Sequence, residues 1–197
     1  GVVNVILKED FEGCEVSGGG GFADGYDEYN ASAIWGINGE DSNVTLVLDY
    51  FRNSTLKNSE RGPLGTADQS ARGGEDFRSS RGFPGRFIAN GVTTIDPACP
   101  PDRRAGQTCV YDYGPWNLLT PEAERTGLML LGNKRFGDIE FFTEIAAQHN
   151  TSIAQGAPTP LDESAGLTVP VTHPNNPYPG ATSLAIGRFR TVDAGPR

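Results

Sequence analysis

Residues 139–150 read Ile-Glu-Phe-Phe-Thr-Glu-Ile-Ala-Ala-Gln-His-Asn, and this stretch decides the fold class. Its odd-numbered positions are largely apolar, whereas its even-numbered positions include two carboxylates and two amides. Side chains of a β-strand point alternately to opposite faces, so this alternation predicts a strand with one apolar and one polar face. We expect Glu140, Glu144 and Gln148 on the polar face.

Four further segments are predicted to be strands. Residues 29–38 and 44–53 repeat the alternation clearly, and residues 125–134 repeat it more weakly. We also assign the glycine-rich residues 11–22 as a strand. The expected fold class is therefore all-β, with antiparallel up-and-down strands.

The connections between these strands fall into two kinds. Residues 39–43 and 135–138 are short and rich in Gly, Asn and Asp, which is typical of tight turns. Residues 57–123, and the chain from 151 onward, are predicted to be long loops without structure of their own. Such loops are unusual in a compact soluble domain, whereas a transmembrane barrel alternates short turns on one side with long loops on the other. Strand parity places both long loops at one end of the sheet and both tight turns at the other.

Composition excludes several classes of protein. Gly (26) and Pro (14) together make up about a fifth of the 197 residues, which favours strands and turns over helix bundles. A net charge of −9 argues against binding to nucleic acid, since phosphates require a basic face. No apolar run approaches the 18 residues or so that a membrane helix needs, but barrel strands need only about 9–11 alternating residues.

Five strands cannot close a membrane barrel, because the smallest have about eight. An open sheet with one apolar face would leave that face and both edges exposed. The chain also begins with Gly1, without a targeting signal, and stops at Arg197 within a polar stretch. We therefore expect a fragment of a larger protein.

Three short segments resemble TonB-dependent outer-membrane receptors. Residues 1–13 (Gly-Val-Val-Asn-Val-Ile-Leu-Lys-Glu-Asp-Phe-Glu-Gly) resemble the junction between the plug of such a receptor and its first barrel strand. Residues 121–125, followed by a strand, a tight turn and a strand ending in Asn-Thr-Ser, are similar to an early hairpin of large members. Residues 175–179 (Asn-Asn-Pro-Tyr-Pro) resemble a motif in the loop that follows.

The resemblance implies a domain layout and a function. Residues 1–8 would be the end of the plug, and residues 9–197 would be the first part of a transmembrane β-barrel. The whole protein would take up a scarce ligand (an iron chelate, a vitamin or a saccharide) across the outer membrane of a Gram-negative bacterium. Its partners would be outer-membrane lipid, a small-molecule ligand, and TonB with ExbB and ExbD, which would act through an N-terminal region outside this sequence.

The candidate ligand-binding residues lie in the first long loop. Residues 61–116 are expected to form an extracellular lid whose arginines hold an anionic ligand and whose aromatic rings supply a stacking surface. The candidates are Arg78, Arg81, Phe83, Arg86, Tyr111, Tyr113 and Trp116. The alternative is a solvated loop in which the arginines pair with nearby carboxylates, since residues 57–123 carry as many acidic as basic side chains.

The cysteines predict a crosslink rather than a metal site. Cys99 and Cys109 lie close together in the first long loop, and an oxidising location favours a disulfide between them. The alternatives are that both thiols are free or that they form half of a metal site, but no further Cys or His follows at metal-site spacing. Cys14 is interpreted as a small apolar residue of a strand. No metal and no cofactor are expected.

Two other function classes stay open. A secreted or cell-surface β-sandwich that binds carbohydrate would suit the four Asn-x-Ser/Thr sequons, which begin at residues 30, 43, 53 and 150. A secreted hydrolase is disfavoured, because no nucleophile elbow occurs. Glu140 and Glu144 could act as an acid–base pair, but we interpret them as part of the water-exposed, lumen-facing side of a barrel strand. We expect no catalytic residue and no enzymatic activity.

Overall fold

The computed structural model describes residues 11–191, which form antiparallel sheets, turns and short 3₁₀ helices. The predicted end of the plug, residues 1–8, lies outside the described residues. The chain divides into two compact units. We call Gly1–Leu56 with Leu118–Ala154 the sheet unit, and Lys57–Asn117 with Gln155–Arg197 the loop unit.

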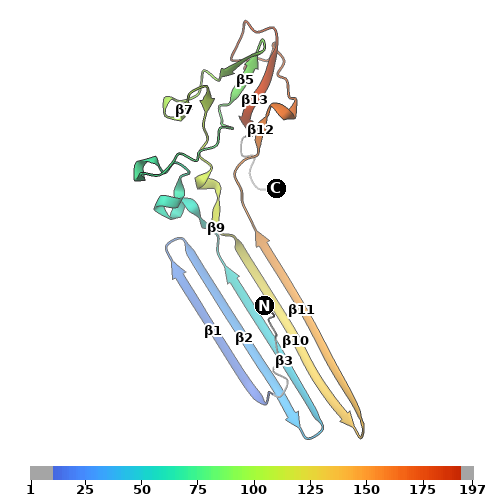
Figure 1. Ribbon diagram of the computed structural model, residues 1–197. Coiled ribbons are helices and arrows are strands. Elements are labelled where there is room, and N and C mark those ends of the chain that lie inside the picture. The colour runs from blue at the N-terminus through green and yellow to red at the C-terminus, as the bar shows by residue number, and fades with distance from the viewer. Residues whose placement is uncertain (1–10, 192–197) are drawn as a thin grey trace. The chain divides into compact units, whose positions relative to one another are not determined.

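The sheet unit is one five-stranded antiparallel sheet (Figure 1). In spatial order its strands are β1 (Gly13–Ala23), β2 (Tyr26–Gly39), β3 (Ser42–Asn53), β10 (Glu122–Phe136) and β11 (Ile139–Ile153). All five predicted strands are confirmed, and four of them extend by two or more residues, because the pairing continues to the two-residue turns and, between β10 and β11, to Glu122 and Ile153 at the other end. The sheet is open, so β1 and β11 each present a free edge within the described part of the chain.

The hairpin turns have the residues that their backbone requires. The β1–β2 turn contains Gly25 at φ 71°, and the β10–β11 turn contains Gly137 at φ 61°. A positive φ is left-handed backbone, which glycine adopts without steric cost and which matches the twist of a two-residue hairpin.

The register confirms the predicted parity of the strands. Asn53 is paired with Glu28 on one side and with Ala123 on the other, so β3 ends where β10 begins. The first long segment therefore leaves and re-enters the sheet at this end, the second long segment leaves it here after β11, and the turns at residues 40–41 and 137–138 lie at the opposite end.

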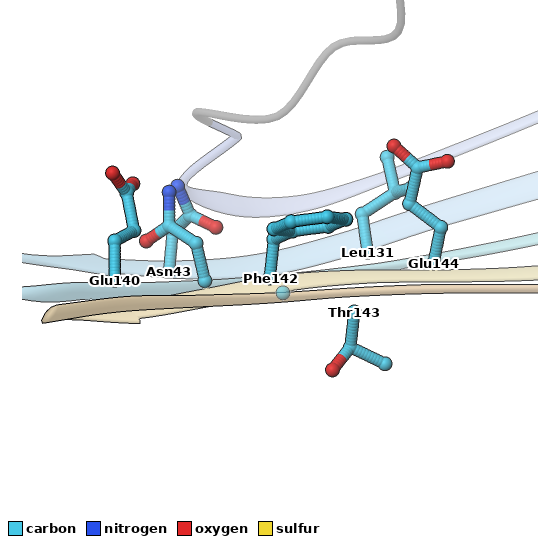
Figure 2. A pocket seen from close by; sticks show the side chains of 8 residues that line it. Asn43, Leu131, Glu140, Phe142, Thr143 and Glu144 are labelled. Atoms are coloured by element: carbon cyan, nitrogen blue, oxygen red, sulfur yellow. The ribbon is translucent and has the colours of Figure 1, made fainter.

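Pairing also fixes which side chains share a face. Glu140, Glu144 and Gln148 lie on one face, which we call the polar face, as the alternation predicts. Figure 2 shows Glu140 and Glu144 on one side of β11 and Thr143 on the other. We call the opposite side, which carries Ile139 and Ile145, the apolar face.

The chain enters the sheet across the polar face. A Cβ atom built on Gly36 would collide with the backbone carbonyl of Phe11, so only glycine permits this close approach. Thr45, the register partner of Gly36 on β3, is completely buried. The segment just before β1 therefore lies against the polar face at this point.

The loop unit contains a sheet of its own, and the prediction of two structureless loops is wrong. Its order is β12 (Pro160–Asp162), β13 (Leu184–Arg190), β5 (Arg86–Ala89) and β6 (Val92–Ile95) (Figure 1). Strand β13 comes from the second long segment and β5 from the first, so neither segment carries a complete local pattern. The sheet forms only when residues about a hundred positions apart pair.

Short elements complete the chain. Two-stranded ladders are formed by β4 (Leu56–Lys57) with β9 (Leu118–Thr120), and by β7 (Arg104–Ala105) with β8 (Thr108–Cys109). The 3₁₀ helices are η1 (Asn58–Glu60), η2 (Gly62–Gly65), η3 (Ser70–Arg72), η4 (Pro101–Arg103), η5 (Gly114–Trp116) and η6 (Glu163–Ala165).

An aromatic cluster forms the core of the loop unit. The ring of Phe189 on β13 meets the rings of Phe83 and Phe87 edge-on, at centroid distances of 5.5 and 6.0 Å. Phe87 also meets Tyr178, whose hydroxyl donates to the carbonyl of Ile95. Burial raises the pKa of Tyr178 to about 12, so this phenol stays a donor at physiological pH.

Candidate functional site

The apolar face is the largest unpartnered surface of the described strands. Every large exposed hydrophobic side chain on the five-stranded sheet lies on it, with the exception of Phe142. They are Val16, Phe22, Tyr29, Trp35, Ile37, Val44, Leu48, Leu128, Phe136, Ile139, Phe141, Ile145 and Ile153. Soluble monomers rarely expose a contiguous apolar patch beyond a few hundred Å². A face of this kind is typical of a contact with another protein or with lipid.

Aromatic pairs stand at both ends of this face. Near the tight turns, the rings of Phe136 and Phe141 meet edge-on at 6.0 Å. At the opposite end, Phe22 meets Tyr29 at 5.7 Å. The register rows between them are mainly aliphatic, for example Leu46, Leu130 and Ile145, although Trp35 completes this row. The face is thus an aliphatic band with an aromatic border at each end.

The polar face carries most of the acidic and amide side chains of the sheet. Glu15, Glu28, Asp49, Glu140 and Glu144 share it with the cations Arg125 and Arg135. An open hollow of about 410 Å³ lies on this face. Figure 2 shows Phe142 between Glu140 and Glu144 in this hollow. Buried Asn43 and Leu131 also line it. This face is suited to water or to a polar partner.

Three of the candidate arginines are held in ion pairs inside the loop unit. The guanidinium of Arg78 contacts Asp76 at 2.9 Å and Asp68 at 3.4 Å. Arg81 donates to Asp162, and Arg86 contacts Glu163 at 2.9 Å. Only Arg78 is paired with carboxylates of its own loop, whereas Arg81 and Arg86 are paired with carboxylates of the second long segment.

These ion pairs shift the pKa of their acids. Hydrogen bonds from Ser164, and then from Arg81, lower the pKa of Asp162 to about 2. A hydrogen bond from Arg78 lowers the pKa of Asp76. Both carboxylates are therefore ionised at physiological pH and can hold their arginines.

The candidate aromatic residues have separate positions. Phe83 packs against Phe189, and Tyr111 lies under the guanidinium of Arg190 at 4.6 Å. Tyr113 caps η5 and Trp116 ends it. The seven predicted ligand residues therefore lie in one unit but take part in different internal contacts.

The sequence did not single out the arginines of the second long segment. Arg188 and Arg190 alternate along β13 and lie on the same face of the loop-unit sheet as Asp162 on β12. Two arginines separated by one residue are typical of one face of a β-strand, and this pattern could have predicted β13 within residues 151–197.

The cysteines form the predicted crosslink. Cys99 and Cys109 are joined by a disulfide, with their Cα atoms 5.9 Å apart, and both are buried. Cys14 is an exposed free thiol. Among residues 11–191, no group of three or more His, Cys, Asp or Glu side chains could hold a metal ion. In the same range, no helix is both long and apolar enough to span a bilayer.

Comparisons of the chain with protein-family models, with curated proteins and with solved structures each found no match.

Proposed function

We propose that this chain is the beginning of the barrel of a TonB-dependent receptor, which takes up a scarce ligand across the outer membrane of a Gram-negative bacterium. The observation that carries the proposal is the separation of the sheet into an apolar face, bordered by aromatic rings, and a polar face. A transmembrane barrel needs this separation, because its outside meets lipid and its inside meets water.

The height of the apolar band supports a membrane contact. From Ile139 to Thr151 on β11, which lies in the register row of Tyr29, the band extends about 41 Å along the strand, at about 3.4 Å per residue. A strand tilted by about 45° would convert this length into a band roughly 29 Å tall, comparable with the apolar height of about 25 Å of outer-membrane barrels. Aromatic rings at its two borders would then lie at the headgroup level of each leaflet.

The entry of the chain supports a polar lumen. Phe11 lies on the polar face, against Gly36, on the side that would be the inside of the barrel. In TonB-dependent receptors the plug lies there, and residues 1–13 resemble the junction between plug and barrel. TonB, with ExbB and ExbD, would act through the region that precedes this sequence.

The ligand would be captured by both long segments together. The first segment starts and finishes at one end of the sheet and the second starts there, at what would be the extracellular end, and the two segments fold into one unit through β5 and β13. An extracellular lid would therefore include residues from 155 onward as well as residues 61–116.

Fractionation of the full-length protein tests this function against the β-sandwich alternative. A receptor should appear in the outer membrane, require detergent for extraction, and migrate differently on a gel before and after boiling. A carbohydrate-binding module should be released in soluble form without detergent. Recovery of the full-length protein in a soluble fraction would overturn the proposal.

A further inference from the structure

We propose that Arg86 and Arg188 form an oxyanion-binding site in the loop unit, and that Glu163 occupies this site in the absence of ligand. The site would accept a ligand that carries a carboxylate or phosphate group. The inference rests on the proposed function only for the claim that the bound ligand is transported.

The two arginines are direct cross-strand partners. Arg188 on β13 lies opposite Arg86 on β5, at a register shift that follows Ile186. Because the neighbouring Phe87 and Phe189 pack against each other on one face, the two cationic side chains project from the other face. Like charges placed directly opposite each other destabilise an antiparallel pair. A compensating negative charge is therefore required between or beside them.

Protein groups compensate this pair only in part. Among the described residues, Glu163 is the one carboxylate within ion-pair distance of either guanidinium, at 2.9 Å from Arg86. Arg188 instead donates to the neutral hydroxyl of Ser80, at 2.9 Å. Asp162, the register partner of Arg188 on β12, ion-pairs with Arg81 instead, so Glu163 is the carboxylate left for both cations.

The two arginines also lack hydrogen-bond acceptors. The Nε atoms of both Arg86 and Arg188 are buried and have no hydrogen-bond acceptor among the described protein atoms. A buried donor without an acceptor is costly, and a guanidinium presents its N–H groups as a fork that matches the oxygen atoms of a carboxylate or a phosphate. A small adjustment of the two side chains would let one oxyanion accept from both.

The surroundings reinforce the positive charge. Arg190 is on the same face of the sheet and is buried without a carboxylate partner in the described part of the chain. Its neighbour Arg81 is paired with Asp162. Glu163 therefore lies in a positive field: besides a backbone hydrogen bond at Glu163 itself, the charges of Arg86 and Arg188 lower its pKa.

Glu163 is placed where a ligand could displace it. Its side chain is 46% exposed and belongs to the one-turn helix η6, whereas Arg86 is only 15% exposed. Rotation of Glu163 toward solvent would uncover the guanidinium without unfolding a strand. The carboxylate is then an internal competitor of the ligand's oxyanion.

Binding of inorganic phosphate and of malonate to the purified full-length protein tests the site, with chloride keeping the ionic strength constant. Glu163→Gln removes the competitor and should tighten oxyanion binding by about tenfold, since a charge-assisted hydrogen bond no longer has to be broken. Arg188→Gln should weaken binding by at least about tenfold. Arg78→Gln is the matched control and should change nothing, because Arg78 is already neutralised by Asp76 and Asp68.

Equal affinity in the parent protein and in Glu163→Gln would overturn the site, and so would equal effects of Arg188→Gln and Arg78→Gln. Should Arg188→Gln fail to fold, the exposed Glu163→Gln variant still decides the question. Failure here leaves the proposed function intact, because oxyanion binding is measured directly and not through uptake. A protein that binds oxyanions but is recovered in a soluble fraction would contradict the proposed function alone.

Discussion

At the scale of single residues, Arg190 ties the loop unit together. Its guanidinium donates to the carbonyls of Arg81 and Pro158 and to the hydroxyl of Ser79, and it lies over the ring of Tyr111. It is 5% exposed, and burial lowers its pKa. The contacts join residues from both long segments, so one side chain links two parts of the chain that are distant in sequence.

Substitution of Arg190 should therefore destabilise the loop unit. We expect Arg190→Met to lower the free energy of unfolding by about 3 kcal/mol, because three buried acceptors lose their donor. Arg190→Lys should recover little of this loss, because an ammonium group cannot span the same acceptors. The measurement is denaturant unfolding followed by the fluorescence of Trp116, with exposed Arg72→Met as the control. Similar unfolding midpoints for the Arg190 and Arg72 variants would contradict the assigned role.

At the scale of elements, the pairing of β5 with β13 makes one unit from two long segments. Phe87 on β5 is buried and packs against Phe189 on β13. Asn90 at the end of β5 accepts from the backbone of Thr182 and Ser183. Neither long segment could bury these groups alone, so the two segments should gain and lose structure together.

Deletion of β13 (Leu184–Arg190) tests this mutual dependence. Removing it should expose Phe87 and make residues 57–117 sensitive to protease, although the deletion lies far away in sequence. The five-stranded sheet should keep its protection, because none of its strands pairs with β13. The matched control is a deletion within the exposed residues 172–175 of the same segment. Resistance of residues 57–117 after loss of β13 would show that the first segment folds independently.

The difference between strands that pair with chain neighbours and strands that pair with remote segments explains what could be predicted from the sequence. The strands of the five-stranded sheet were predictable because each carries its own alternation, and short turns force neighbours to pair. The loop-unit sheet was not, because β5 and β12 are only four and three residues long and their partner is remote in sequence. The Cys99–Cys109 disulfide was predictable because both residues lie within one short segment. The Arg86–Arg188 pair was hidden because its two halves belong to different loops.

At the scale of the whole molecule, the central claim is that the apolar face meets lipid and the polar face lines a lumen. Phe141 lies at the aromatic border of the band, whereas Ile145 is close to its middle, in one register row with Leu46, Leu130 and Trp35. Charges on the lipid face of a barrel cost most at the midplane and little near the headgroups. Ile145 is therefore the sharper place to test the claim.

The most direct measurement compares Ile145→Arg with Glu144→Arg in the refolding of the full-length protein into lipid vesicles. The two positions are adjacent on β11 and point to opposite faces, so strand propensity and depth are matched. The account predicts that Ile145→Arg destabilises the folded, inserted protein by about 2–4 kcal/mol, whereas Glu144→Arg changes its stability by less than about 1 kcal/mol. Equal tolerance of arginine at both positions would contradict a membrane-spanning sheet.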